Sequence, residues 1–246
     1  FLDSNMIIGR NILIAARDYG VKHFINLGSS CMYPKSATGL LSEDLLMTGQ
    51  LEPTNEGYAL AKLVTAKLCQ YIKQENPKMI YKTLIPCNIY GKYDNFDPQY
   101  SHLVPAIVYK IHNAKVNNLK FIDVWGDGEQ TRSFMYIDDC IDGTLKVFNS
   151  NEREVFNIGS EEQVSINQMI KLIEEIANYK VEKNYQLDKP KGVRGRSSDN
   201  SLVNKKVKWK PNLTLKEGLT QTYNWIENQI NSGSNIEKFC QSNIEK

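Results

Sequence analysis

The sequence lacks the marks of several classes of protein. No apolar run approaches the ~20 residues that a membrane-spanning helix needs. The net charge is only +2 and no stretch is strongly basic, so nothing in the composition indicates nucleic-acid binding. The three histidines and five cysteines never cluster at the spacing of metal ligands, and we therefore expect no bound metal.

Paired cysteines are also missing, because the five are scattered and none forms a CxxC motif. They are Cys31, Cys69, Cys87, Cys140 and Cys240. This pattern is typical of reduced thiols and predicts a cytoplasmic protein. The 246 residues, 41% hydrophobic and 24% charged, suit one large globular domain or two small ones.

Helical and strand patterns alternate along the first part of the chain. The apolar spacing predicts helices over 1–20 (ended by Gly20) and Tyr58–Lys73, and buried strands over 21–28 and Tyr81–Gly91. This alternation predicts an α/β fold with a parallel sheet and helices on its faces. The two strands lead into GSSC and PCNIYG, and ligands of open α/β sheets bind beyond the carboxyl ends of strands. We therefore expect both segments to face one crevice.

The second part of the chain continues the mixture of helices and strands. Helices are predicted over Leu103–Asn113, from Asp138, after the capping residue Ser165 and over LKEGLTQTYNWIENQI, and strands over Lys120–Trp125, Ser133–Ile137 and EVFNIG. The Gly-punctuated, basic segment KPKGVRGRSSDNS is predicted to be a loop. The tail 233–246, which contains SNIEK twice, is predicted to be disordered.

Tyr58 and Lys62 stand four residues apart in YALAK, on one face of the predicted helix. A lysine ammonium near a phenol lowers the pKa of the tyrosine, which makes it a usable general acid or base. A chance YxxxK on a helix surface is the alternative. GSS, which precedes the pair, could supply a hydroxyl partner.

Several motifs together resemble the extended short-chain dehydrogenase/reductase superfamily and, within it, the GDP-L-fucose synthase family. They are GSSCMYP, LEPTNEGYALAK, PCNIYG, SHLVPA and WGDGEQTRSFMYIDD. The resemblance implies a Rossmann-like doubly wound parallel sheet with a smaller C-terminal α/β substrate domain. It also implies NADPH-dependent conversion of GDP-4-keto-6-deoxy-D-mannose to GDP-L-fucose, by 3,5-epimerisation and then 4-keto reduction.

The same resemblance implies a division of the chain. Residues 1–96 would be the C-terminal part of the NADP-binding domain, and 97–232 mainly the substrate domain, with a segment near 133–160 returning to the first. The family's glycine-rich GxxGxxG turn, which seats the cofactor pyrophosphate, does not occur in the sequence. From the order of the motifs we expect that roughly 75–80 residues precede this chain in a longer protein. Helices Phe1–Asp18 and Tyr58–Lys73 would form the interface of a homodimer.

The resemblance also implies roles for single residues. Tyr58 would donate a proton to the C4 oxygen, Lys62 would bind the nicotinamide ribose, and Ser29 would hydrogen-bond the 4-keto oxygen. The cofactor would be lined by these three together with Leu27, Gly28, Ser30, Pro86, Cys87, Asn88, Ile89 and His102. For Ser30, a simple backbone cap is the favoured alternative.

Cys31 and His102 correspond to the family's acid/base pair for epimerisation. A 4-keto group acidifies the hydrogens on C3 and C5, and inversion at each carbon needs a base on one face and an acid on the other. A free thiol titrates at about pH 8.5 and an imidazole at about 6.5, so the two straddle neutrality. The alternatives are a small buried hydrophobe for Cys31 and, for His102, a residue that merely neighbours a helix N-cap.

The sugar-nucleotide end would rest on polar and aromatic residues farther along the chain. The candidates are Asn88, Lys110, Trp125, Arg132, Arg194 and Arg196. Arg132 can grip a diphosphate in fork geometry, and Trp125 offers a flat surface. For Lys110, surface solvation is the alternative.

The segment GVRGRSSDN departs from the usual fucose-synthase loop, and Lys191 stands where an acidic residue is expected. This segment resembles the GDP-mannose 3,5-epimerase family. A GDP-mannose 3,5-epimerase or a related GDP-4-keto-heptose epimerase/reductase is therefore the alternative function. A non-catalytic fragment that keeps only sugar-nucleotide binding or dimerisation is an alternative of another class.

Overall fold

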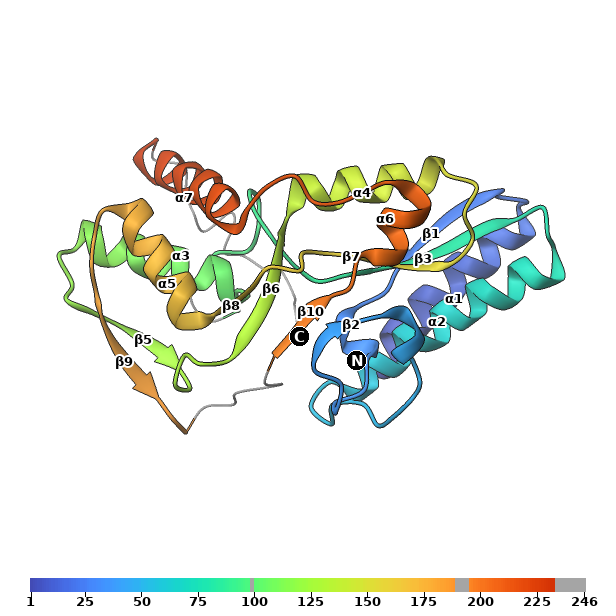
Figure 1. The fold of residues 1–246 in the computed structure, drawn as a ribbon, viewed down its shortest axis with the longest axis horizontal. Helices are drawn as coiled ribbons and strands as arrows, with labels where there is room; N and C mark the ends of the chain where they lie inside the picture. The colour runs from blue at the N-terminus through green and yellow to red at the C-terminus, as the bar shows by residue number, and fades with distance from the viewer. Residues whose placement is uncertain (98–99, 189–194, 233–246) are drawn as a thin grey trace.

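The structure is a computed structural model that describes residues 1–97, 100–188 and 195–232. A three-stranded parallel sheet lies at one end of the molecule (Figure 1). Its strands, in spatial order, are β1 (His23–Leu27), β3 (Ile80–Pro86) and β7 (Val155–Ile158). Helices cover both faces, so the predicted α/β fold with a parallel sheet is confirmed. The predicted tail 233–246 lies outside the described residues.

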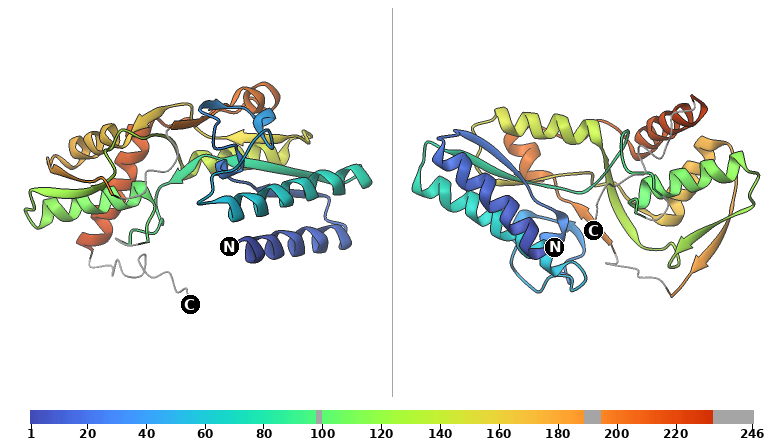
Figure 2. Two further views of the ribbon diagram at one scale, coloured as in Figure 1. Left: turned by 90° about the horizontal axis from the view of Figure 1, so that it is seen from below. Right: turned by 180° about the vertical axis from the view of Figure 1, so that it is seen from behind.

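Two long helices lie side by side along one face of this sheet, α1 (Leu2–Asp18) and α2 (Glu56–Glu75) (Figure 2). Their close approach depends on Gly9, because a Cβ there would lie 2.5 Å from Thr65 Oγ1. Gly20, at φ +69°, follows α1 and ends it as predicted. On the opposite face lie α4 (Ile137–Asn149) and the short α6 (Ser201–Val207).

The single strand predicted over Tyr81–Gly91 is wrong. The chain forms β3, breaks at Cys87, and continues as β4 (Asn88–Tyr90) in a different sheet. Pro86 has no N–H to donate to a sheet ladder, and the N–H of Cys87 donates to Ile158 O on β7. The segment that follows β3 therefore crosses from the first sheet to the second, at the level where both sheets end.

The second sheet is built from short strands drawn from distant parts of the chain. Its spatial order is β2 (Gly39–Leu41), β10 (Gly195–Ser198), β6 (Thr131–Tyr136) and β4, with β8 (Gln163–Ser165) antiparallel to β6. The prediction of a loop throughout KPKGVRGRSSDNS is wrong for 195–198. That segment pairs with strands on both sides, a long-range contact that its polar sequence does not announce.

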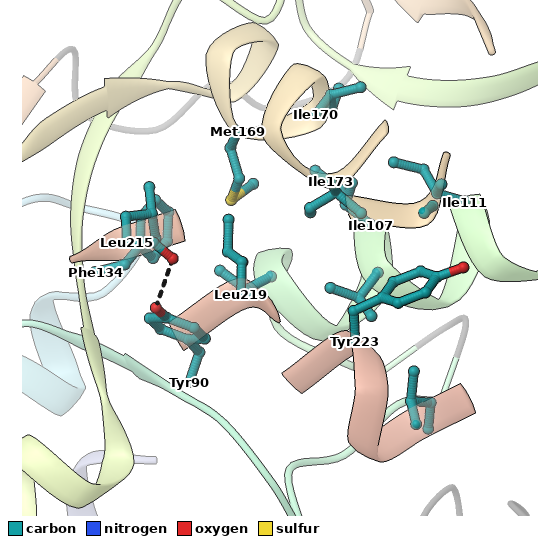
Figure 3. Packing of buried hydrophobic residues seen from close by; sticks show 14 of the residues in the cluster. Tyr90, Ile107, Ile111, Phe134, Met169, Ile170, Ile173, Leu215, Leu219 and Tyr223 are labelled. Atoms are coloured by element: carbon teal, nitrogen blue, oxygen red, sulfur yellow. Dashed lines mark hydrogen bonds between the residues drawn. The ribbon is translucent and has the colours of Figure 1, made fainter. Parts of the chain in front are cut away.

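The far end of the molecule packs three helices around a separate core (Figure 3). These are α3 (Leu103–Val116), α5 (Ile166–Ala177) and α7 (Leu215–Asn231). As predicted, Ser165 caps α5, accepting a hydrogen bond from Gln168 N. Tyr90 Oη donates to Leu215 O at 3.3 Å and so connects β4 to the start of α7.

A parallel ribbon of β5 (Phe121–Trp125) and β9 (Glu182–Gln186) lies at the edge; β9 was not predicted. Within the described ranges, no helix is long and apolar enough to cross a membrane.

Candidate active site

A cavity of about 930 Å³ opens where β1 and β3 end, between the starts of α2 and α3. Its lining includes the segments 28–31 and 86–94, so the expectation that GSSC and PCNIYG face one crevice is confirmed. A smaller hollow of about 210 Å³ adjoins it and extends under the second sheet. Ser30, Cys31 and Arg132 line both spaces, which makes the turn after β1 the junction between them.

Cys31 sits on a single 3-10 turn, η1 (Ser30–Met32), directly after β1. Ser29 Oγ accepts the backbone N–H of Cys31 at 3.2 Å and caps this turn. The backbone cap predicted for Ser30 is therefore wrong by one residue, because the extended backbone of Ser29 places its side chain over the free N–H groups. The turn presents the side chains of three consecutive residues, Ser29 to Cys31, to the cavity.

Tyr58 lies in the first turn of α2 and lines the cavity opposite the Cys31 turn. Burial raises the pKa of Tyr58; a side-chain hydrogen bond with Ser29 lowers it in part, and the charge of Cys31 raises it again. Tyr58, Ser29 and Cys31 therefore influence one another within one cavity, although they come from two separate elements.

The expectation that Lys62 lowers the pKa of Tyr58 is wrong for this structure. Lys62 Nζ donates to Leu27 O at 2.9 Å and lies 5.7 Å from the centroid of the Tyr58 ring. The ammonium is thus held at the end of β1 and over the ring rather than on the phenolic oxygen. Burial also lowers the pKa of Lys62.

His102 is the residue before α3 and faces the cavity as an exposed side chain that caps no N–H of the helix. Asp94 lines the same cavity. Burial raises the pKa of Asp94, while the Asn95 backbone N–H and then His102 lower it. Sequence reasoning missed Asp94. Its only signal is a carboxylate in the loop between the PCNIYG and SHLVPA motifs.

The remaining predicted cofactor residues lie along the crossing from β3 to β4. Pro86, Cys87, Asn88 and Ile89 all line the cavity, and Gly28 does so from the end of β1. Asn88 Nδ2 donates to Ser133 O at 2.9 Å. Burial raises the pKa of Cys87 to about 11, so this second thiol in the cavity stays protonated at neutral pH. Leu27 and Lys62, also predicted to bind the cofactor, are not among the residues that line the cavity; they are hydrogen-bonded to each other behind it.

Two arginines stand side by side in the second sheet. Arg132 on β6 and Arg196 on β10 are paired in register, and both line the smaller hollow. Burial lowers the pKa of Arg132, and the charge of Arg196 lowers it further. Glu52, another residue that sequence reasoning missed, faces the same hollow and raises the pKa of Arg196 in part. The hollow therefore holds two cations and one carboxylate within reach of Cys31.

Two other predicted substrate residues, Lys110 and Trp125, do not line these two spaces. Lys110 Nζ donates to Asp123 O at 2.9 Å, and Trp125 is 59% exposed on the outer side of the β5–β9 ribbon. Arg194 lies outside the described residues. In the described part of the chain, no group of three or more His, Cys, Asp and Glu side chains could hold a metal ion.

Comparison with known proteins places this geometry among nucleotide-sugar enzymes. A model of the NAD dependent epimerase/dehydratase family matches residues 1–159. The chain is 42% identical to GDP-L-colitose synthase of Yersinia pseudotuberculosis, over 94% of this chain and 76% of the relative. It is 38% identical to GDP-L-fucose synthase of Sinorhizobium fredii, over 91% of this chain and 71% of the relative. The fold matches a GDP-L-fucose synthetase of Naegleria fowleri bound to NADP, with a TM-score of 0.83 over 94% of this chain and 74% of that one, at 24% identity.

Proposed function

The chain belongs to the NAD dependent epimerase/dehydratase family, and on that premise we propose that it converts GDP-4-keto-6-deoxy-D-mannose to GDP-L-fucose. It is an NADP(H)-dependent epimerase/reductase that acts on a GDP-sugar. The observation that carries the proposal for this substrate is that Ser29, Cys31, Tyr58 and His102 line one cavity. These four supply the groups that inversion beside a ketone and reduction of that ketone require.

The residues present fit the reactive end of the cofactor. The cavity of about 930 Å³ lies at the carboxyl ends of two parallel strands and has the size of ligand sites, about 300–1,000 Å³. We propose that Gly28, Ser29 and Pro86–Ile89 hold the nicotinamide end and that Lys62 holds its ribose. When bound, the cofactor would supply a hydride, one proton with two electrons, to C4. The sequence has no glycine-rich turn to seat the pyrophosphate.

Epimerisation in this proposal is carried by Cys31 and His102. The 4-keto group stabilises the carbanion left at C3 or C5, so one residue can remove the hydrogen while the other returns a proton on the opposite face. Cys31 projects from the turn after β1 and His102 from the start of α3, so the two enter the cavity from different elements. Asp94 lines the same cavity as His102 and places a carboxylate there.

Reduction in this proposal depends on Tyr58 and Ser29. As C4 is reduced, its oxygen becomes an alkoxide that needs a proton. Because burial raises the pKa of Tyr58, the phenol stays protonated at neutral pH and can donate one. Ser29 hydrogen-bonds Tyr58 and can share the sugar oxygen with it.

The test is NADPH oxidation, followed by absorbance, with GDP-4-keto-6-deoxy-D-mannose as substrate. Oxidation that requires this sugar and yields GDP-L-fucose supports the proposal. Interconversion of GDP-mannose and GDP-galactose without net NADPH use supports the second candidate, a GDP-mannose 3,5-epimerase, which the segment GVRGRSSDN favours. A chain that shows no NADPH-dependent thermal shift and no turnover is a non-catalytic binding or dimerisation unit.

We also propose a homodimer through α1 and α2. Their outer faces expose large apolar side chains: Ile7, Ile8, Ile12, Leu60, Val64 and Tyr71. Such a face on two packed helices suits a four-helix interface with a second copy. Ile8→Glu should shift a dimer to monomer in light scattering, whereas Ile141→Glu, on the exposed side of α4, should not.

The division into 1–96 and 97–232 is likewise proposed. β7 pairs with β3, which supports the return of 133–160 to the first domain. A cytoplasmic location stays a prediction from the sequence.

A further inference from the structure

Arg196 reaches from the middle of the second sheet to the turn that carries Cys31. Its Nη2 donates to Pro34 O at 2.6 Å, and its Nη1 approaches Ser30 O at 3.5 Å. These two carbonyls bracket Cys31 on both sides along the chain. The planar guanidinium can bind two acceptors at once, which a lysine ammonium does with less precision. Arg196 therefore contacts the turn at two points from a strand that lies 162 to 166 residues later in the sequence.

The side chain of Arg196 is only 9% exposed, and its buried Nε has no hydrogen-bond partner among the described residues. A charged group held this way in the interior needs a compensating negative charge nearby. Burial lowers the pKa of Arg196, and the charges of Cys31 and then Glu52 raise it. Arg196 and Cys31 also line the same hollow of about 210 Å³. Arg196 and Cys31 therefore face one hollow and interact electrostatically.

We propose that Arg196 is a positioning residue for Cys31, which fixes the turn of 30–34 through its backbone carbonyls and holds a permanent positive charge beside the thiol. The inference rests on the proposed function, because Cys31 needs this support as an acid/base group. The other charged or titratable groups that line the two spaces with Cys31 include Tyr58, Arg132, Glu52, Tyr33, Cys87, Asp94 and His102. Arg196 differs from these in binding the backbone of the turn itself.

The charge can be tested without substrate or cofactor. Iodoacetate and iodoacetamide alkylate the same thiol and differ in charge, so the ratio of their rates reports the electrostatic field at the sulfur. Mass spectrometry of the Cys31 peptide separates its reaction from that of the other cysteines. In Arg196→Met, the ratio of iodoacetate to iodoacetamide rates should fall about fivefold relative to the wild type, the scale of one partly screened charge pair. Arg196→Lys, which keeps the positive charge, should retain most of the wild-type ratio of iodoacetate to iodoacetamide rates.

Tyr33→Phe is the matched control, because Tyr33 Oη donates to Asn157 Oδ1 at 2.7 Å and so holds the same turn without adding charge. It should leave the ratio unchanged. The proposal fails if Arg196→Met keeps the wild-type ratio, or if Tyr33→Phe lowers it equally. Circular dichroism checks folding, and Arg196→Gln replaces the Met variant if that one does not fold. A failed NADPH assay alone would count against the proposed function, whereas an unchanged alkylation ratio counts against the role of Arg196.

Discussion

Lys62 Nζ donates a 2.9 Å hydrogen bond to the carbonyl oxygen of Leu27, the last residue of β1. This bond ties α2 to the end of the strand that leads into Ser29 and Cys31. Tyr58 lies one helical turn before Lys62, so the same bond fixes the position of the Tyr58 phenol relative to the hydroxyl of Ser29. The spacing YxxxK thus has a structural consequence: the lysine anchors the helix that presents the tyrosine.

Tyr58→Phe should separate the two halves of the reaction. Without the phenolic proton, NADPH oxidation should fall at least about 100-fold, the usual contribution of a general acid. Entry of solvent deuterium into the sugar, which depends on Cys31 and His102, should persist. Tyr71→Phe, on the same helix with an exposed ring, is the control and should change neither rate. Equal loss of both activities would contradict the division of roles.

The pH dependence of the wild type tests the same residue. Because burial raises the pKa of Tyr58, the protonated donor should persist through neutral pH and be lost only in strongly alkaline solution. The rate of reduction should therefore show no loss from Tyr58 between about pH 6 and about pH 9. A Tyr58-dependent fall near neutrality, absent from the residual rate of Tyr58→Phe, would show instead a phenol with a lowered pKa.

Cys31→Ser should reduce deuterium incorporation at C3 and C5 by about 100-fold or more, because a serine hydroxyl loses its proton far less readily than a thiol and so supplies almost no anionic base at neutral pH. Cys87→Ser is a matched control within the same cavity. Burial raises the pKa of Cys87 to about 11, so its thiol carries no base function at neutral pH. The exchange is measured by mass spectrometry of the recovered sugar nucleotide. Full exchange in Cys31→Ala would exclude Cys31 as the base.

The fold was predictable where hydrophobic periodicity is strong and local. The sequence pattern of α1, α2, β1 and α5 indicates their existence and ends, down to the Ser165 cap. It failed at β4, β9 and β10, which are short or polar strands. Each of these forms only because a partner strand from a distant part of the chain supplies the hydrogen bonds, and single-sequence patterns carry no record of that partner.

The candidate site divides in the same way. Motifs next to strong elements, such as GSSC after β1 and PCNIYG at the end of β3, could be placed in one crevice before the structure was known. The sequence did not predict the places of Asp94 and Glu52 in the site, or the hydrogen bonds of Arg196 to the turn at Cys31. These positions depend on how loops and the second sheet fold back over that turn. Lys110 and Trp125 show the opposite outcome. Both are plausible substrate-binding residues by type and position in the sequence, yet both lie outside the cavity lining.

Asp94→Asn should slow deuterium exchange about tenfold while leaving the reduction step much less affected. The carboxylate and His102 line the same cavity and interact electrostatically, and the amide would remove the negative charge from that pair. The loss should appear in kcat rather than KM, because Asp94 acts through His102 in this account. Asp97→Asn, three residues farther on and outside the cavity lining, is the control. Equal effects of the two substitutions would make Asp94 a loop-stabilising residue only.

The pH dependence of folding stability can be tested at Glu43, which belongs to a hydrogen-bond network behind the Cys31 turn. Its Oε1 accepts the N–H of Asn157 at 2.7 Å, and Asn157 in turn accepts the hydroxyl of Tyr33. Burial raises the pKa of Glu43, partly offset by the hydrogen bond from Asn157. The folded protein therefore binds this proton more tightly than the unfolded chain does. The resulting stability is fully present below the ordinary pKa of a glutamate and is lost as pH rises through the raised value.

Glu43→Gln mimics the protonated carboxyl and keeps an oxygen that can accept from Asn157. The variant should therefore be more stable than the wild type at pH 8, and this advantage should shrink toward zero as pH falls to about 4.5. Thermal unfolding followed by circular dichroism measures it, with about 2–4 °C expected per kcal/mol in a chain of this size. Asp44→Asn, the exposed neighbour, should show no such trend. A difference in Tm that is constant across pH would mean that Glu43 is ionised equally in the folded and unfolded states.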